Sequence, residues 1–109
     1  MKAHTRLYLH FAKSHHGLDP HELFCEITGY VSMSLDVCHI DPRGMGGNPK
    51  GDKDCIENLM MMTRTLHNAT EGLFIEQLTY AHNKWIETGR PLYETDYGYF
   101  KENFEPLMG

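Results

Sequence analysis

The sequence predicts a single α+β domain over residues 1–109, in which helical segments flank a central stretch of extended chain. Apolar residues at helical spacing indicate an N-terminal helix over residues 3–14 and another over 74–85. Between these helices, residues 30–40 favour an extended conformation. A length of 109 residues is typical of one domain, and the sequence has no apolar run long enough to cross a membrane.

Local signals place the boundaries of the N-terminal half. The first helix is expected to end near Gly17, because glycine readily adopts the left-handed conformation that ends helices. Asp19 and Glu22 flank Pro20 in the pattern of a capping box, which predicts a short helical turn. Alternation along the extended run that follows should put three side chains on one face, namely Leu35, Val37 and His39.

A glycine- and proline-rich segment over residues 41–55 is expected to be a loop. The apolar run that follows, residues 56–62, is too short for periodicity to distinguish a strand from a helix. Thr63 is suited to cap a helix that runs to about Glu71, with Gly72 as the break after it.

The C-terminal part contains the strongest helical pattern. Four apolar residues, Phe74, Leu78, Ala81 and Trp85, form a stripe that should face the core. Gly89 and the Arg-Pro pair after it should end this helix. Residues 92–109 are rich in aromatic and acidic side chains, and we expect only a packed irregular segment there.

Charge is unevenly distributed along the chain. The net charge of −5 argues against a protein that coats nucleic acid without specificity. Residues 1–18, however, contain Lys2, Arg6 and Lys13 and no acidic residue. This basic arm is either an ordinary solvated helix face or a segment that binds DNA phosphates.

The cysteines do not indicate a cross-linked or zinc-knotted protein. Cys25, Cys38 and Cys55 are odd in number and form no C-x-x-C pair, so neither a disulfide framework nor a four-cysteine zinc site is expected. Together with an N-terminus that lacks an apolar signal segment, this cysteine usage favours the cytoplasm.

Residues 25–74 contain an ordered series of motifs. These are Cys-Glu-Ile-Thr-Gly at 25–29, Asp-Val-Cys-His-Ile-Asp-Pro-Arg at 36–43, Gly-Gly at 46–47, Glu-Asn-Leu at 57–59 and His-Asn-Ala-Thr-Glu-Gly-Leu-Phe at 67–74. The series resembles the HNH endonuclease family, in which His-Ile-x-Pro ends a strand, Asn-Leu opens a second strand and a histidine lies on the next helix. The resemblance covers roughly half of the chain. It implies a ββα-metal core with flanking N- and C-terminal helices.

The resemblance also implies a function. It implies hydrolysis of DNA phosphodiester bonds with a divalent metal ion (Mg, Mn, Zn or Ni), leaving 5′-phosphate and 3′-hydroxyl ends. His39 would be the general base, His67 a metal ligand and Asn58 the residue that braces the loop. Arg43 is at a position where members often carry a basic residue, and we expect it to bind phosphate.

The resemblance bears on assembly as well. Small single-domain members are typical of phages and bacteria. A chain with one catalytic centre would nick one strand, whereas double-strand cleavage would need a homodimer or sequential cuts. Only the short basic arm could contact bases, so sequence specificity would have to come from a partner protein.

The metal ligands are only partly determined by the sequence. His67 and Glu71 are four residues apart on a predicted helix, so both should project from one face and could bind one divalent ion. Family members usually carry Asp or His directly before the base, and here that residue is Cys38. Either Cys38, as a thiolate, or Asp36, on the same strand face, could be the first ligand.

Two alternatives to a nuclease stay open. The departure at Cys38 and the acidic bulk of the chain are compatible with a DNA-binding module that keeps the fold without activity. A zinc-stabilised adaptor is the other alternative, with ligands drawn from the cysteines and the predicted base (Cys25, Cys38, His39 or Cys55).

Overall fold

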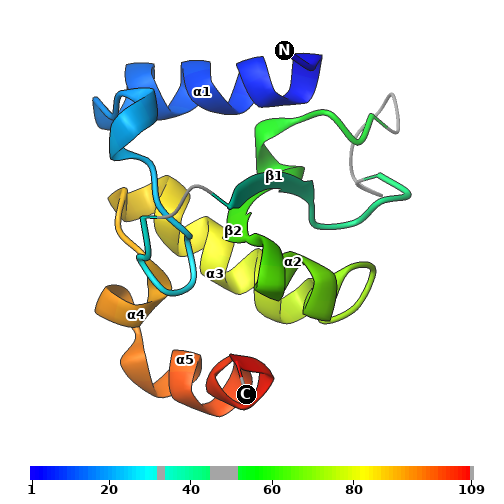
Figure 1. The fold of residues 1–109 in the computed structure, drawn as a ribbon, viewed down its shortest axis with the longest axis vertical. Helices are drawn as coiled ribbons and strands as arrows, with labels where there is room; N and C mark the ends of the chain where they lie inside the picture. The colour runs from blue at the N-terminus through cyan, green and yellow to red at the C-terminus, as the bar shows by residue number, and fades with distance from the viewer. Residues whose placement is uncertain (32–33, 45–51, 109) are drawn as a thin grey trace.

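A two-stranded antiparallel sheet lies at the centre of the fold, with helices above and below it (Figure 1). The computed structural model describes residues 1–31, 34–44 and 52–108. Strand β1 (Leu35–His39) pairs with β2 (Leu59–Thr63), and α2 (Arg64–Thr70) follows β2 directly. The predicted α+β class is confirmed.

Both faces of the sheet are covered by apolar side chains. On one face, Met60 and Met62 pack in a cluster with α2, α3 (Ile75–Thr88) and α5 (Tyr97–Asn103). On the other face, Leu59 and Met61 pack with α1 (Ala3–His16) and with Trp85. A strand buried on both faces reads as an unbroken apolar run, which is why periodicity did not identify β2.

The N-terminal helix and the turn after it agree with the sequence-based boundaries. Helix α1 ends at His16, and Gly17 follows in the left-handed conformation with φ 69°. The chain then forms the capping box between Asp19 and Glu22 around a short 3₁₀ turn at Pro20–Glu22. Both features are local, so the chain specifies them without help from the tertiary fold.

The extended run is shorter than predicted, since strand β1 covers only residues 35–39 of the expected 30–40. Leu35 and Val37 share a face, as predicted, and both pack against the cluster on the α1 side of the sheet. Residues 32–33 lie outside the described residues. So does the segment 45–51 of the predicted loop, which includes the Gly-Gly pair of the motif series.

Helices α2 and α3 begin and end close to the predicted residues. The hydroxyl of Thr63 accepts a hydrogen bond from the Leu66 amide and caps α2. Gly89, at φ 71°, ends α3. Phe74 differs from the prediction, because it precedes α3 with φ 57° and is 38% exposed, so it does not belong to the buried stripe. His82 is buried on that helix instead.

The expectation of an irregular C-terminal segment is wrong. Residues 92–109 contain α4 (Leu92–Thr95), α5 and a 3₁₀ turn at Glu105–Met108. The Asp96 side chain caps α5 by accepting a hydrogen bond from the Tyr99 amide, and Phe100 and Phe104 are buried. Tyrosine and glycine have modest helix propensity, so burial of the aromatic side chains, a tertiary effect, stabilises this helix.

A buried polar network joins α1, β2 and α3. The Glu26 carboxylate accepts hydrogen bonds from the Tyr8 hydroxyl, the Met61 amide and His82 Nδ1, the last at 2.6 Å. His82 Nε2 lies 2.6 Å from the carbonyl oxygen of Ile56. Because both ring nitrogens of His82 face acceptors, the ring is a doubly protonated imidazolium paired with the Glu26 carboxylate.

This network predicts a loss of stability at alkaline pH. Burial lowers the pKa of His82, but the Glu26 carboxylate and the Ile56 carbonyl outweigh it and raise that pKa above its usual value of about 6.5. The stabilisation is therefore complete below about pH 6.5. It is lost as the pH rises through the raised pKa that His82 has in the folded chain. Tyr8 stays protonated in this range, because burial raises the pKa of its hydroxyl.

We expect the free energy of unfolding, measured with urea, to fall as the pH rises above about 6.5 in the wild-type chain. The fall should be smaller in His82→Gln, which has no titrating ring at this position. Parallel curves for the two proteins would show that His82 is not the titrating group.

No helix in the described part of the chain is both long and apolar enough to cross a lipid bilayer.

Candidate active site

His39, the predicted general base, lies at the end of β1 between two other polar side chains. Its Nε2 lies 2.6 Å from Oδ1 of Asp54, and its ring packs against the ring of His4 with centroids 4.9 Å apart. The hydrogen bond to His39 lowers the pKa of Asp54, which is therefore an ionised acceptor. When Nε2–H donates to this carboxylate, Nδ1 carries the lone pair that can accept a proton.

Asn58 fixes the two described ends of the loop that follows β1. Its side chain is buried; Oδ1 accepts from the Asp41 amide at 2.8 Å, and Nδ2 donates to the carbonyl oxygens of Asp41 and Lys53 at 2.9 and 3.0 Å. Asp41 follows His39 by two residues, and Lys53 immediately precedes Asp54. Asn58 thus holds the segments that carry both members of the His39–Asp54 pair.

A second polar pair connects β1 to α2. Nδ1 of His67 lies 3.3 Å from Oδ2 of Asp36. Arg64 also binds this carboxylate, with Nη2 at 3.1 Å from Oδ1 and Nε at 3.3 Å from Oδ2. Hydrogen bonds from Arg64 and then from His67 lower the pKa of Asp36, so its carboxylate is ionised at neutral pH.

The Asp36–His67 separation fits two ligands of one cation. Two adjacent ligand atoms bound to an octahedral Mg²⁺ or Mn²⁺ lie about 3 Å apart, given metal–ligand distances of about 2.1 Å. The observed 3.3 Å between Nδ1 of His67 and Oδ2 of Asp36 is close to this value and long for a charge-assisted hydrogen bond. One imidazole and one carboxylate are also ligands that several divalent metals accept.

Cys38 does not share the position of Asp36, although both are on the sheet face that alternation predicted. Cys38 is 2% exposed and belongs to the apolar cluster, where its Sγ contacts the Asp36 carbonyl at 3.4 Å. Burial raises the pKa of its thiol, which disfavours the thiolate that binds metals. Of the two alternatives for the first ligand, the structure therefore brings Asp36 to His67.

Glu71 lies at the C-terminal end of α2, one residue after the last residue of the helix. Helix α2 ends at Thr70, and Glu71 at its C-cap has ψ 117°, outside the helical region. The side chain of Glu71 is exposed. Among the described residues, the groups that could hold a metal ion do not include Glu71.

A hollow of about 430 Å³ runs along β1 next to these groups. It is lined by residues from α1, the sheet and α2, namely Lys2, His4, Thr5, Leu35, Asp36, Val37, Met61 and His67. His39 and Asp36 are on opposite faces of β1, as strand alternation requires. The hollow connects them, because His4, the ring neighbour of His39, lines it together with Asp36 and His67.

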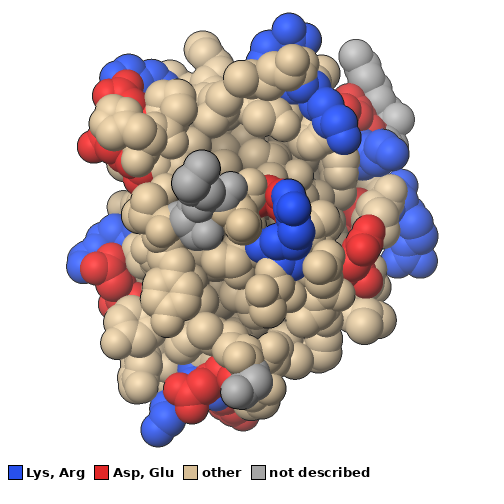
Figure 2. Space-filling model, in the orientation of Figure 1, with Lys and Arg blue, Asp and Glu red and all other residues tan. Residues whose placement is uncertain are grey.

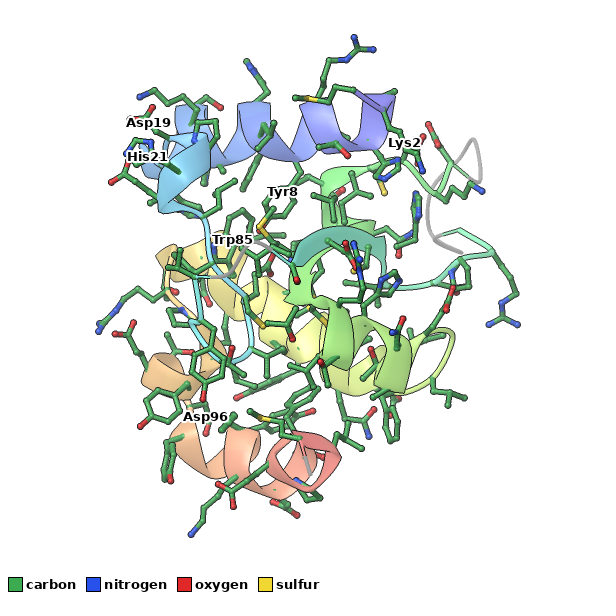
Figure 3. All side chains as sticks on the ribbon, viewed as in Figure 1. Lys2, Tyr8, Asp19, His21, Trp85 and Asp96 are labelled. Carbon is green, nitrogen blue, oxygen red and sulfur yellow. The ribbon has the colours of Figure 1, made fainter. Side chains whose placement is uncertain are left out.

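Basic side chains gather on the same side of the molecule, over the start of α1 and around the loop after β1 (Figure 2). Lys2 belongs to this group and lies at the opposite end of α1 from Asp19 (Figure 3). Asp19 forms an ion pair of 2.7 Å with Lys13, so Lys13 is both remote from the hollow and neutralised. Arg6 is exposed on α1. Arg43 is 82% exposed, and its Nε lies 3.3 Å from Oδ1 of Asp41.

Sequence reasoning missed His4, Asp54 and Arg64. His4 precedes His39 by 35 residues in the sequence, so no local spacing signals that their rings meet. Asp54 is one acidic residue among several in a loop. Within the described ranges, two groups of His, Asp and Glu could hold a metal ion, and neither includes a cysteine: His4, His39 and Asp54, and on the surface Asp19, His21 and Glu22.

The chain matches no protein-family model, and no curated protein or solved structure is significantly similar to it.

Proposed function

We propose that this chain is a metal-dependent DNA endonuclease of the HNH type. The observation that carries the proposal is the pairing of His39 with Asp54 at the end of β1, beside a hollow that is lined by Asp36 and His67. This arrangement supplies a proton acceptor, a candidate metal site and, beside both, a hollow for a phosphodiester, since His4, the ring neighbour of His39, lines it together with Asp36 and His67. The strand–strand–helix order of β1, β2 and α2 supports the same reading.

The residues of the chain have separate roles in the proposed reaction. Asp54 holds the His39 ring through Nε2, so that Nδ1 takes a proton from the water that attacks phosphorus. Asp36 and His67 would hold the divalent ion, which supplies Lewis-acid stabilisation of the charge that develops on the phosphate. Lys2, at the rim of the hollow, binds the DNA backbone. With one such site per chain, the proposed product is a nick.

Incubating supercoiled plasmid with the wild-type chain tests this proposal. We expect conversion to the open-circular form with Mg²⁺ or Mn²⁺ and complete arrest by a chelator. Ni²⁺ and Zn²⁺ should be assayed in parallel, because imidazole and carboxylate ligands accept them too. A plasmid that stays supercoiled with all four metals would contradict the assignment and favour a binding module.

Two substitutions identify the first metal ligand. Asp36→Asn keeps the size of the side chain but removes its charge, and we expect it to weaken Mn²⁺ binding by about 10- to 100-fold or more, as judged by titrating Mn²⁺ in the nicking assay and by calorimetry. Cys38→Ala should bind Mn²⁺ like the wild type, because its thiol is buried in the apolar cluster. The reverse result would identify Cys38 as the ligand.

The basic arm is expected to act through Lys2 rather than Lys13. Lys2→Ala should reduce the slope of log Kobs for DNA against log[salt] by about 0.9, the effect of losing one phosphate contact. Lys13→Ala is the matched control, because Lys13 is ion-paired with Asp19 at the far end of α1. Fluorescence anisotropy of a labelled duplex at several salt concentrations measures both slopes. Equal slopes for Lys2→Ala and wild type would remove Lys2 from the interface.

A further inference from the structure

Three potential metal ligands converge at the end of β1, on the opposite face of the strand from Asp36. His4 comes from the start of α1, His39 from the end of β1 and Asp54 from the segment before η2 (Ile56–Asn58). Their ligand atoms all lie within 4.8 Å of one another, and each residue is half-buried. No helical or strand repeat brings these three residues together, so the tertiary fold itself creates the cluster.

The donor set differs in chemistry from the Asp36–His67 pair. Two imidazoles and one carboxylate are typical ligands of Zn²⁺, whereas Mg²⁺ prefers oxygen ligands and retains its waters. In a tetrahedral zinc site with bonds of about 2.0–2.1 Å, ligand atoms lie about 3.3 Å apart. Nε2 of His39 and Oδ1 of Asp54 are now 2.6 Å apart, so binding would need only a small separation of these two atoms. Three protein ligands leave a fourth position for water.

The surface group of Asp19, His21 and Glu22 provides a contrast. Asp19 already forms an ion pair with Lys13. The two acidic residues of this group, Asp19 and Glu22, also form the capping box. At the His39 cluster, the Asp54 carboxylate has a ring nitrogen as its partner, and a metal can replace the proton that the two share. Lys2 and Lys53 add positive charge near His4, so we expect weaker affinity than at a structural zinc site.

We infer that His4, His39 and Asp54 form a second metal site, selective for Zn²⁺ and similar transition-metal dications, and that its occupation switches off the proposed nuclease. A metal bound at Nε2 of His39 displaces the proton from that nitrogen, and the neutral ring then carries its proton on Nδ1, which has no lone pair left to accept a proton from water. The inhibitory part of this inference rests on the proposed function. The binding part does not, because it depends only on the three ligands.

Titration of the metal-free chain with Co²⁺ and Zn²⁺ tests the binding part. Tetrahedral Co²⁺ absorbs in the visible range, and Zn²⁺ should displace it. We expect His4→Ala to weaken Zn²⁺ binding at this site at least tenfold, since losing even an outer partner of a ligand typically costs about 10- to 100-fold. His10→Ala, which removes an exposed imidazole from the same helix, should bind as the wild type does. His4→Gln provides a second variant of similar side-chain size.

The double variant Asp36→Asn/His67→Ala separates the two sites. It should keep the Co²⁺ spectrum, because its His4–His39–Asp54 cluster is intact. A spectrum that is lost in this double variant but kept in His4→Ala would place the metal at Asp36 and His67 alone and overturn the inference. Absence of any Co²⁺ or Zn²⁺ binding to the wild-type chain would overturn it as well.

Inhibition is measured separately, by adding Zn²⁺ to the Mg²⁺-supported nicking reaction. We expect Zn²⁺ to stop nicking by the wild type, and the concentration for half inhibition to rise at least tenfold in His4→Ala relative to that protein's own rate without Zn²⁺. Equal inhibition of both proteins would refute the switch. A chain that binds Zn²⁺ through His4 but never nicks DNA would refute the proposed function and leave the metal site intact.

Discussion

Replacing His39 by alanine is expected to slow plasmid nicking by about 10²- to 10⁴-fold, the usual contribution of a positioned general base. In the His39–Asp54 pair, the His39 ring is the proposed proton acceptor and Asp54 only orients it. Without the ring, Asp54 has no base to orient. The rate should be measured under single-turnover conditions with saturating Mg²⁺, as loss of supercoiled plasmid over time.

Two controls make this result specific to the chemical step. His39→Ala should bind a DNA duplex with an affinity close to that of the wild type, because the proposed phosphate contact comes from Lys2. It should also melt within a few degrees of the wild type, since the His39 side chain is only half-buried. Equal nicking rates in the variant and the wild type would mean that the activity has another source.

Replacing Glu26 by alanine is expected to lower the free energy of unfolding by about 3–5 kcal/mol. The change leaves the His82 imidazolium buried without its counter-charge, and it removes the acceptor for the Tyr8 hydroxyl and the Met61 amide. A domain of this size is typically stable by about 5–15 kcal/mol, so the loss would be a large part of the total. Urea denaturation at about pH 6 gives the value directly.

Glu87 and His82 supply the comparisons for this experiment. Glu87→Ala removes an exposed carboxylate from α3 and should change stability by no more than about 0.5 kcal/mol. The double variant Glu26→Ala/His82→Ala should lose less than the sum of the two single variants, because the two groups are in direct contact. Additive losses would indicate that Glu26 and His82 contribute independently.

The features that sequence could predict are those that depend on a few neighbouring residues. Gly17 and Gly89 end their helices by adopting the left-handed conformation. Thr63 begins α2 by accepting a hydrogen bond from the Leu66 amide. Strand β2 was ambiguous because both of its faces are buried. Helix α5 was missed because its aromatic residues gain stability from burial rather than from helix propensity.

The residues of the candidate site divide in the same way, into those that local sequence patterns could predict and those that depend on tertiary packing. The motif series predicted His39, Asn58 and His67 as one group; the structure brings Asn58 to the segment after His39, and it brings His67 to Asp36. Alternation put Asp36 and Cys38 on one face but could not show that only Asp36 is accessible, since burial along a strand depends on what covers it. The positions of His4 and Asp54 depend on how distant segments pack, and single-sequence patterns do not encode that.

The buried carboxylate of Glu26 has a consequence for the helix that carries Lys2 and His4. Through Tyr8 it fastens α1 to β2 and α3. Detaching α1 would take the Tyr8 hydroxyl away from the buried Glu26 carboxylate and open the apolar cluster that α1 shares with Leu59, Met61 and Trp85, so the helix should separate from the sheet only when the core opens. The end of α1 beside the hollow is therefore a rigid wall of the site and belongs to the same cooperative unit as the core.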